Sequence, residues 1–363
     1  MYASAFEGKT VLLTGHTGFK GAWLAIYLKR LGAHVIGYAL QPLTDPSLFE
    51  TSGIRDHITH ILADVRDTAH LQQVIQEHRP DFVFHLAAQA LVLESYRDPY
   101  ETFSVNVMGT ASVLEAVRLA KHPCVVVVIT TDKVYENRNW IYGYREVDPL
   151  GGHDPYSASK AAAEIVISSY RSSFFAASAV KLASARAGNV IGAGDWSAHR
   201  IIPDAVRALH QDEPLIVRNP NSVRPWQHVL EPLSGYLWLA AKMAQNGGEK
   251  YASAWNFGPL PAAYTVRDLV EAVVHEWGSG EWRTEQDPNA PHEANLLSLS
   301  TEKAINALEW FPVWDFEATI HETILGYKRM LQADTHQGCL DTINATISAY
   351  EAAASAKGLA WTF

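Results

Sequence analysis

Residues 10 to 31 read TVLLTGHTGFKGAWLAIYLKRL. The apolar and β-branched run at 10–14 predicts a strand, the glycines at 15, 18 and 21 form a loop, and a helical pattern follows at once. Glycine allows a tight turn and lets the backbone approach a pyrophosphate at the N-terminus of the helix. Three glycines alone are a weak signal, but their place between the first strand and a helix predicts a dinucleotide-binding turn.

Strand-like and helical segments continue to alternate as far as about residue 173. The run VVVVI at 125–129 is typical of a strand that is buried on both faces of a parallel sheet. The alternation therefore predicts an α/β fold with a doubly wound parallel sheet of the Rossmann type. The expected strands are 10–14, 33–39, 57–62, 82–86 and 124–130, and the expected helices are 21–31, 69–76, 99–119 and 157–173.

Glycine and proline interrupt the chain more often from about residue 189, which indicates a second, smaller, C-terminal substrate domain. A strand at 252–258 is expected to return to the first sheet, so that the two domains are interleaved. The predicted dinucleotide-binding domain is 1–188 with about 228–258, the predicted nucleotide-sugar-binding domain is about 189–227 with 259–330, and a helical tail occupies 331–363.

The composition is that of a globular protein with a large core, since 48% of the 363 residues are hydrophobic and 19% are charged. The formal charge is −10 and no block of Lys or Arg occurs, so neither nucleic acid nor an anionic membrane is an expected partner. Cys124 and Cys339 are the two cysteines, too few for a disulfide framework. Without a secretion signal, a membrane-spanning stretch or a zinc-ligand spacing, we expect a cytoplasmic protein with no metal.

Tyr156 and Lys160 stand four residues apart in a predicted helix and therefore share one face. An ammonium group beside a phenol lowers the phenol pKa and leaves a phenolate that can take a proton from a hydroxyl group. The spacing alone would often arise by chance in an ordinary surface pair. About 24 residues earlier, however, Thr131, Asp132 and Lys133 supply candidates for a second proton transfer. Together these residues predict an enzyme that acts on a carbohydrate-like alcohol.

Motifs between residues 8 and 320 extend this interpretation. They are TGHTGFKGAWL (14–24), ADVRD (63–67), FHLAAQ (84–89), NVMGT (106–110), TTDKVYEN (130–137), DPYSASK (154–160), RAGNVIGAGDW (186–196), RPWQHVLEPLSGYL (224–237), WNFGP (255–259) and PHEANLLSLS (291–300). The set resembles the extended short-chain dehydrogenase/reductases, specifically the nucleotide-sugar 4,6-dehydratases. The CDP-glucose branch is the most similar, because the dTDP-glucose and GDP-mannose branches carry Glu where Lys133 stands.

The resemblance implies a closed redox cycle with NAD that ends in a 4-keto-6-deoxy sugar. Tyr156, as phenolate, would take the proton of the sugar 4-hydroxyl, with Thr131 steadying that hydroxyl and Lys160 holding the ribose and the phenolate. The resulting ketone acidifies C5. By analogy Asp132 would be the acid that protonates the departing 6-hydroxyl, and Lys133, in its neutral form, would be the base at C5.

The resemblance also assigns binding residues. The cofactor residues are Gly15, Thr17, Gly18, Phe19, Lys20, Gly21, Asp64, Val65, Leu86, Ala87, Ala88, Gln89, Asn106, Thr130, Tyr156 and Lys160, and the substrate residues are Gln89, Asn189, Arg200 and Arg224. The planar fork of arginine suits a diphosphate. Structural roles stay open for several of them: Asp64 could end a strand, and Gln89 and Asn106 could be caps. His228 is interpreted as a packing histidine.

One segment departs from the usual pattern of NAD enzymes, and two positions depart from the family pattern. At the end of the second strand, 38–42 read YALQP, with neither an acid for NAD nor an arginine for NADP, although Asp45 could reach the ribose. Leu93 stands where relatives have an arginine, which puts a sugar or phosphate contact in doubt. Ser300 replaces a usual Asp and would serve equally as a helix cap.

The alternatives are another NAD-dependent nucleotide-sugar dehydratase, for a dTDP-, UDP- or GDP-sugar, or a nucleotide-sugar 4-epimerase. An epimerase shares Tyr156 and Lys160 but does not need the Asp132–Lys133 pair. A non-catalytic dinucleotide-binding regulator is disfavoured by the intact catalytic residues. By analogy the protein is expected to be a homodimer or a dimer of dimers, joined through the helices at 99–119 and 157–173.

Overall fold

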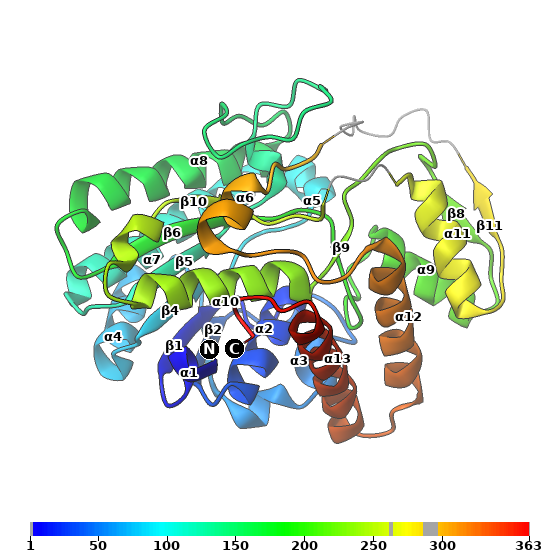
Figure 1. The fold of residues 1–363 in the computed structure, drawn as a ribbon, viewed down its shortest axis with the longest axis horizontal. Coiled ribbons are helices and arrows are strands. Elements are labelled where there is room, and N and C mark those ends of the chain that lie inside the picture. Colours follow the sequence, from blue (N-terminus) through cyan, green and yellow to red (C-terminus); the bar gives the residue numbers. More distant parts are fainter. Residues whose placement is uncertain (1–2, 261–263, 286–296, 363) are drawn as a thin grey trace.

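The computed structural model describes residues 3–260, 264–285 and 297–362, so 291–296 of the last motif lie outside it. Its centre is a seven-stranded parallel sheet with the order β10-β6-β5-β4-β1-β2-β3 (Figure 1). The predicted doubly wound α/β fold is confirmed. The strands are β1 (Thr10–Thr14), β2 (His34–Ala39), β3 (Thr59–Leu62), β4 (Phe82–His85), β5 (Val125–Ile129), β6 (Lys181–Arg186) and β10 (Ala254–Asn256).

Helices cover both faces of the sheet (Figure 1). The alternation of β1 shows why: Val11 and Leu13 pack with one group of helices, while Leu12 between them packs with the other. The first group is α2 (Phe19–Arg30), α10 (Leu230–Ala244) and α13 (His336–Ala356), and the second is α4 (Thr68–His78), α7 (Gly109–Ala120) and α8 (Pro155–Tyr170).

A smaller group of elements lies at one end of the molecule, to the right in Figure 1. It contains α9 (Ile201–His210), α11 (Val266–Trp277), α12 (Phe316–Gln332) and a two-stranded parallel sheet of β8 (Leu215–Val217) and β11 (Trp282–Thr284). A second small sheet pairs β7 (Val190–Ile191) with β9 (Gln227–His228). The division of the chain into two domains at the expected boundaries stays a prediction.

The remaining elements are short. They are α1 (Ala3–Phe6), α3 (Leu48–Thr51), η1 (Ile54–His57), α5 (Val92–Arg97), α6 (Pro99–Phe103), η2 (Ser104–Met108), η3 (Asp132–Val134), η4 (Arg171–Phe175), η5 (Gly248–Tyr251) and η6 (Ala304–Leu308). Among the helices of the described residues, none combines the length and apolarity needed to cross a membrane.

Most predicted elements lie within a few residues of their observed places. The expected strand at 252–258 is β10, which joins β6 at the sheet edge. The helix expected at 99–119 is not uniform, because the π-helical turn η2 separates α6 from α7. The helix expected at 157–173 begins earlier, where Asp154 caps it by accepting from Ser157 N and Pro155 stands in the first turn.

The tail packs against the sheet domain through a buried carboxylate. Glu231 in α10 is 1% exposed and accepts hydrogen bonds from Val313 N (2.9 Å), Trp314 N (2.7 Å) and Tyr350 Oη (2.8 Å) of α13. Burial raises the pKa of Glu231 to about 7, although these hydrogen bonds oppose the shift. The tail is therefore joined to the core at a site that titrates near neutrality.

Glu231→Gln tests this linkage. The folded protein holds the Glu231 proton up to about pH 7, and the unfolded chain releases it near 4.5, so Glu231 lowers stability as the pH rises between these values. The contribution is about 3 kcal/mol across this range. We expect the melting temperature of the wild type to fall from pH 5 to pH 8 more than that of the variant. Parallel melting curves of the two proteins against pH would contradict the assignment.

Candidate active site

The loop between β1 and α2 has room only for glycine at two positions. Gly15 has φ +76°, and a Cβ there would lie 2.6 Å from Ala87 N; a Cβ on Gly21 would lie 2.1 Å from Gly15 O. Gly18 caps α2 without a side-chain hydrogen bond, so the first backbone N–H groups of the helix have no cap. This cradle suits the pyrophosphate of a dinucleotide.

The segment after β4 is held against the catalytic helix by Asn106. Its side chain accepts from Gln89 N (2.9 Å) and donates to Gln89 O (3.0 Å) and to Ser159 Oγ in α8 (2.8 Å). The Gln89 amide itself donates to Thr102 Oγ1 and to Leu91 O. Asn106 thus shapes the loop that includes Leu86, Ala87 and Ala88, while a direct substrate contact of Gln89 stays a prediction.

Asp64 follows β3 and binds Arg66 rather than standing alone. The Asp64 carboxylate accepts from Arg66 N at 2.8 Å and from Arg66 Nη2 at 2.6 Å, and these bonds hold the pKa of Asp64 below its usual value. Arg66 also pairs with Glu101 at 2.7 Å. At the end of β2, Thr17 Oγ1 donates to Leu40 O (2.9 Å), so Thr17 fixes the segment that lacks the ribose acid.

Helix α8 brings Tyr156 and Lys160 to the carboxyl ends of β5 and β6. Lys160 is buried and donates from Nζ to Ile129 O at the end of β5 (2.9 Å). Burial lowers the pKa of Lys160 to about 8, and the charge of Glu164 opposes this. The ammonium is therefore anchored to the sheet.

The phenol of Tyr156 lies among several charges. Burial raises its pKa, while Lys133, a hydrogen bond with Thr131 and the charge of Arg200 lower it. Sequence reasoning assigned the activating charge to Lys160. In the structure Lys133 is the cation that lowers the phenol pKa most. It lies in η3, the turn that follows β5.

The turn at 131–133 concentrates the polar groups. Thr131 Oγ1 donates to Asp132 Oδ1 (2.9 Å), and Lys133 Nζ lies 3.5 Å from the same oxygen. The Asp132 side chain is fully buried, and its Oδ2 has no hydrogen-bond partner among the described residues. A buried acceptor without a donor favours a ligand hydroxyl or a proton at this place. A Cβ on Gly188 would lie 2.0 Å from Oδ2, so the carboxylate rests directly on the Gly188 backbone.

Lys20 and Tyr236 also belong to the site, because they interact with Arg200, Lys160 and Tyr156. Lys20 Nζ lies 5.8 Å from the centroid of the Tyr236 ring. Burial, with the charges of Arg200 and Lys160, lowers the pKa of Lys20 to about 7. Tyr236 is fully buried, and no partner for its hydroxyl occurs in the described part of the chain. Sequence reasoning did not identify Tyr236, because its place in an apolar helix is typical of the core.

Three predicted substrate residues, Asn189, Arg200 and Arg224, are all partly buried. Arg200 pairs with Asp195 at 2.9 Å and acts electrostatically on Lys20 and Tyr156, so it belongs to the site. Asn189 follows β6 with φ +49°. Arg224 donates from Nη1 to Val223 O (2.9 Å). Substrate contacts of these three residues stay predictions.

His228 lies in the core. It contacts the rings of Trp23 and Trp314 edge-on, its Nδ1 accepts from Leu230 N (3.3 Å), and burial lowers its pKa to about 3. These contacts fit the expected packing role, but the ring is not fully satisfied, because Nε2 has no hydrogen-bond partner among the described residues.

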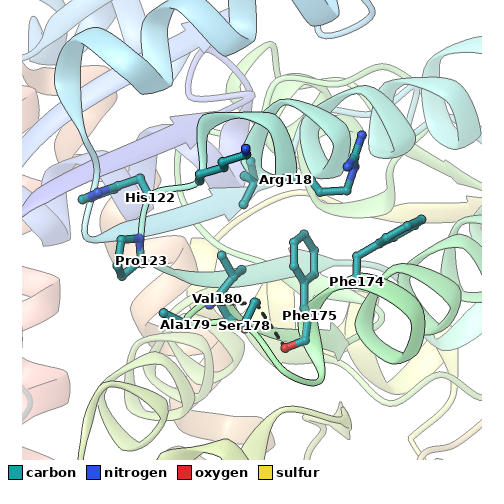
Figure 2. Close-up of a pocket in the computed structure, with 10 residues that line it drawn as sticks. Arg118, His122, Pro123, Phe174, Phe175, Ser178, Ala179 and Val180 are labelled. Carbon is teal, nitrogen blue, oxygen red and sulfur yellow. Dashed lines mark hydrogen bonds between the residues drawn. The ribbon is translucent and has the colours of Figure 1, made fainter.

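Figure 2 shows a pocket near the amino ends of β5 and β6, away from the carboxyl ends where the candidate site lies. It is lined by His122 and Pro123 just before β5, by Phe174 and Phe175 of η4, and by residues 178–180 just before β6. These residues precede β5 and β6, whereas the predicted catalytic residues Thr131, Asp132 and Lys133 follow β5. In parallel α/β sheets ligands bind at the carboxyl ends, so this pocket does not belong to the active site.

Comparison with known proteins agrees with this geometry. The sequence profile of one family, described as GDP-mannose 4,6 dehydratase, matches residues 12–323. The chain belongs to this family. Within the dehydratases it is 46% identical, over 91% of this chain and 93% of the relative, to a CDP-glucose 4,6-dehydratase from Salmonella typhimurium. It is 25% identical, over 92% of this chain and 96% of the relative, to a dTDP-glucose 4,6-dehydratase from Xanthomonas campestris.

Solved structures place the dehydratase chain in the same fold. A UDP-glucose 4-epimerase from Thermus thermophilus in complex with NAD has a TM-score of 0.75 and 26% identity, over 88% of this chain and 99% of that one. A dTDP-glucose 4,6-dehydratase from Bacillus anthracis has a TM-score of 0.75 and 23% identity, over 88% and 97%. The second likeness concerns the fold alone.

Gly188→Ala tests the seat of the Asp132 carboxylate. The added methyl group would collide with Oδ2, so we expect dehydratase turnover to fall about 100-fold, the range of one proton-transfer group. Gly258→Ala is the matched control, because its Cβ has 3.6 Å to its nearest neighbour. Turnover and melting temperature are measured for both. Equal turnover of the two variants would show that the carboxylate does not need this contact.

Proposed function

We propose that this protein is a CDP-glucose 4,6-dehydratase, which converts CDP-D-glucose to CDP-4-keto-6-deoxy-D-glucose and water with NAD as cofactor. The observation that carries the proposal is 46% identity, over 91% of the chain, to the Salmonella enzyme. The site supports it, since Thr131 donates to Asp132, Lys133 acts on the phenol of Tyr156, and Lys160 follows Tyr156 by one turn of α8.

The glycine loop supports NAD as the cofactor. At Gly15 and Gly21 a Cβ atom would collide with the neighbouring backbone, so only glycine fits there. The backbone N–H groups at the start of α2 have no side-chain cap and can bind a pyrophosphate. The end of β2 has neither an arginine for the 2′-phosphate of NADP nor an acid for the ribose of NAD, so the choice of NAD rests on the likeness to a solved structure that holds NAD. When bound, NAD would supply hydride transfer, from C4 of the sugar and later back to C6.

In the first half of the reaction Tyr156 takes the proton of the sugar 4-hydroxyl. Lys133, Thr131 and Arg200 favour the phenolate form that this requires, while burial and the charge of Asp132 oppose it and keep the pKa of Tyr156 above its usual value. Lys160 is bound to Ile129 O, and its other ammonium protons would hold the ribose of a bound cofactor.

In the second half Asp132 and Lys133 eliminate water. The two groups lie in contact at 3.5 Å. In the proposed mechanism Lys133 acts in its neutral form and Asp132 as an acid, which requires that one proton be transferred from Lys133 to Asp132 when the substrate is bound. Lys133 then takes the C5 proton, and Asp132 protonates the departing 6-hydroxyl. Both groups return to their charged forms, so the pair is ready for another cycle.

We further propose that the enzyme is a homodimer. Apolar side chains are exposed along α6, η2, α8 and η4, namely Tyr100, Phe103, Met108, Ile165 and Phe174. A second copy of the chain is the occupant we propose for this face, because both predicted contact helices contribute to it. Sedimentation equilibrium should give a dimer for the wild type and a lighter species for Met108→Glu; a monomeric wild type would exclude this arrangement.

We also propose a cytoplasmic location, supported by two buried, unpaired cysteines.

The test of function is incubation with CDP-glucose, in parallel with dTDP-glucose, UDP-glucose and GDP-mannose, followed by mass spectrometry. We expect loss of one water from CDP-glucose without net consumption of cofactor. Isomerisation without a change in mass would support an epimerase instead. Loss of water from another nucleotide sugar alone would keep the reaction and correct the base.

Asp132→Asn and Tyr156→Phe separate the two halves of the reaction. The amide introduced by Asp132→Asn cannot protonate the departing hydroxyl, so elimination should slow about 100- to 10,000-fold while reduced nicotinamide accumulates on the enzyme. Tyr156→Phe lacks the first base, so neither product nor reduced nicotinamide should form. Single-turnover absorbance of the cofactor measures both. If Asp132→Asn accumulates no reduced nicotinamide, Asp132 acts before elimination and its assigned role is wrong.

A further inference from the structure

A buried ion pair between Glu164 in α8 and Arg186 at the end of β6 lies directly behind the catalytic residues. The two side chains are 3% and 4% exposed. Glu164 Oε1 accepts from Thr130 Oγ1 (2.6 Å) and Arg186 Nε (3.0 Å), and Oε2 accepts from Ser184 Oγ (2.8 Å) and Arg186 Nη2 (2.9 Å). A buried carboxylate with four donors is fixed in one orientation.

The position of Glu164 connects it to the catalytic residues on both sides. On α8 it follows Lys160 by one turn and Tyr156 by two, so the three side chains share a face. Its partner Thr130 directly precedes the turn at 131–133. The Glu164 carboxylate therefore connects α8, which carries Tyr156, to Thr130 at the end of β5, where the turn at 131–133 begins.

Arg186 holds the other end of the same turn. Its Nη1 donates to Tyr135 Oη (2.7 Å), and the guanidinium lies 5.0 Å from the centroid of the Tyr135 ring. Tyr135 directly follows η3 and donates in turn to Asn256 Oδ1 in β10 (2.7 Å). The segment that carries Thr131, Asp132 and Lys133 is thus tied at both flanks to one ion pair.

The charge of Glu164 also reaches the lysine. Burial lowers the pKa of Lys160 to about 8, and Glu164 is the carboxylate that raises it. Loss of this charge would let Lys160 release its proton at lower pH. Buried ion pairs often add little net stability compared with apolar side chains of the same size, so stability alone does not account for this one.

We propose that the Glu164–Arg186 pair positions the catalytic groups. It fixes the turn at 131–133 against Tyr156, and it holds the positive charge on Lys160. The inference rests on the proposed function and adds two positioning residues to it.

Glu164→Gln is the first test, because the amide keeps the shape of the side chain and removes its charge. We expect kcat to fall about 100-fold, the scale of a misplaced catalytic group, with KM nearly unchanged. We also expect the alkaline limb of the kcat–pH profile to move to lower pH by about one unit, as Lys160 loses its proton more easily. An unmoved limb would show that the charge of Glu164 does not support Lys160.

Two further variants distinguish a loss of positioning from a general loss of stability. Thr130→Val removes one hydrogen bond to Glu164 and no charge, so kcat should fall about tenfold while the alkaline limb stays in place. Full activity in Thr130→Val would overturn the positioning role. Glu231→Gln is the matched control, since it replaces another buried glutamate, one that is charged only above about pH 7 and that binds Val313, Trp314 and Tyr350 instead of Thr130 and Arg186. A similar shift of the limb in this control would also overturn the proposal.

Competitive acetylation of lysines across pH, read from the Lys160 peptide by mass spectrometry, gives the pKa of Lys160 without any turnover. We expect a lower value in Glu164→Gln than in the wild type. If no nucleotide sugar reacts, the proposed function fails while this measurement still decides the electrostatic part. Equal values in the two proteins would overturn that part even if CDP-glucose is dehydrated.

Discussion

Parallel pairing is the constraint on which the site depends. All seven strands of the sheet run in one direction, so the loops that follow β1, β4, β5 and β6 meet along a single edge. The glycine cradle, the Asn106-bound loop and the turn at 131–133 come from distant parts of the chain and converge there. Each loop is then fixed by a local contact, of which the bond from Lys160 to Ile129 O is the simplest.

Sequence reasoning succeeded where the determinant is local. The glycine loop was predictable because Gly15 must turn with positive φ and Gly21 must approach it closely. The environment of Asp132 was not predictable, since the carboxylate rests on Gly188, which reaches it only through the pairing of β6 with β5. Tyr236 escaped notice for a related reason: an aromatic residue in a buried helix has the same sequence signature whether or not its hydroxyl has a partner. The π-helical turns also have no simple sequence signal.

The electrostatics reconcile an acidic protein with anionic ligands. The chain carries a formal charge of −10, yet Lys133 and Arg200 act on the phenol of Tyr156, and Arg200 and Lys160 act on Lys20. Two carboxylates, of Asp132 and Asp195, compensate part of this charge. The remainder is of the sign that diphosphates require, and it is concentrated where burial weakens screening by water and salt. The net charge of the whole chain therefore does not predict the charge of the site, where positive side chains outnumber the carboxylates.

The C-terminal network bears on how the chain is made. Glu231 can find Val313 and Trp314 once those residues have left the ribosome, but its third donor, Tyr350, emerges last. During synthesis α10 thus lacks part of its cover, and the apolar surface that α13 will bury stays open to water. A nascent chain that pauses before residue 350 would expose this surface to chaperones, so the burial of this surface waits for the synthesis of α13.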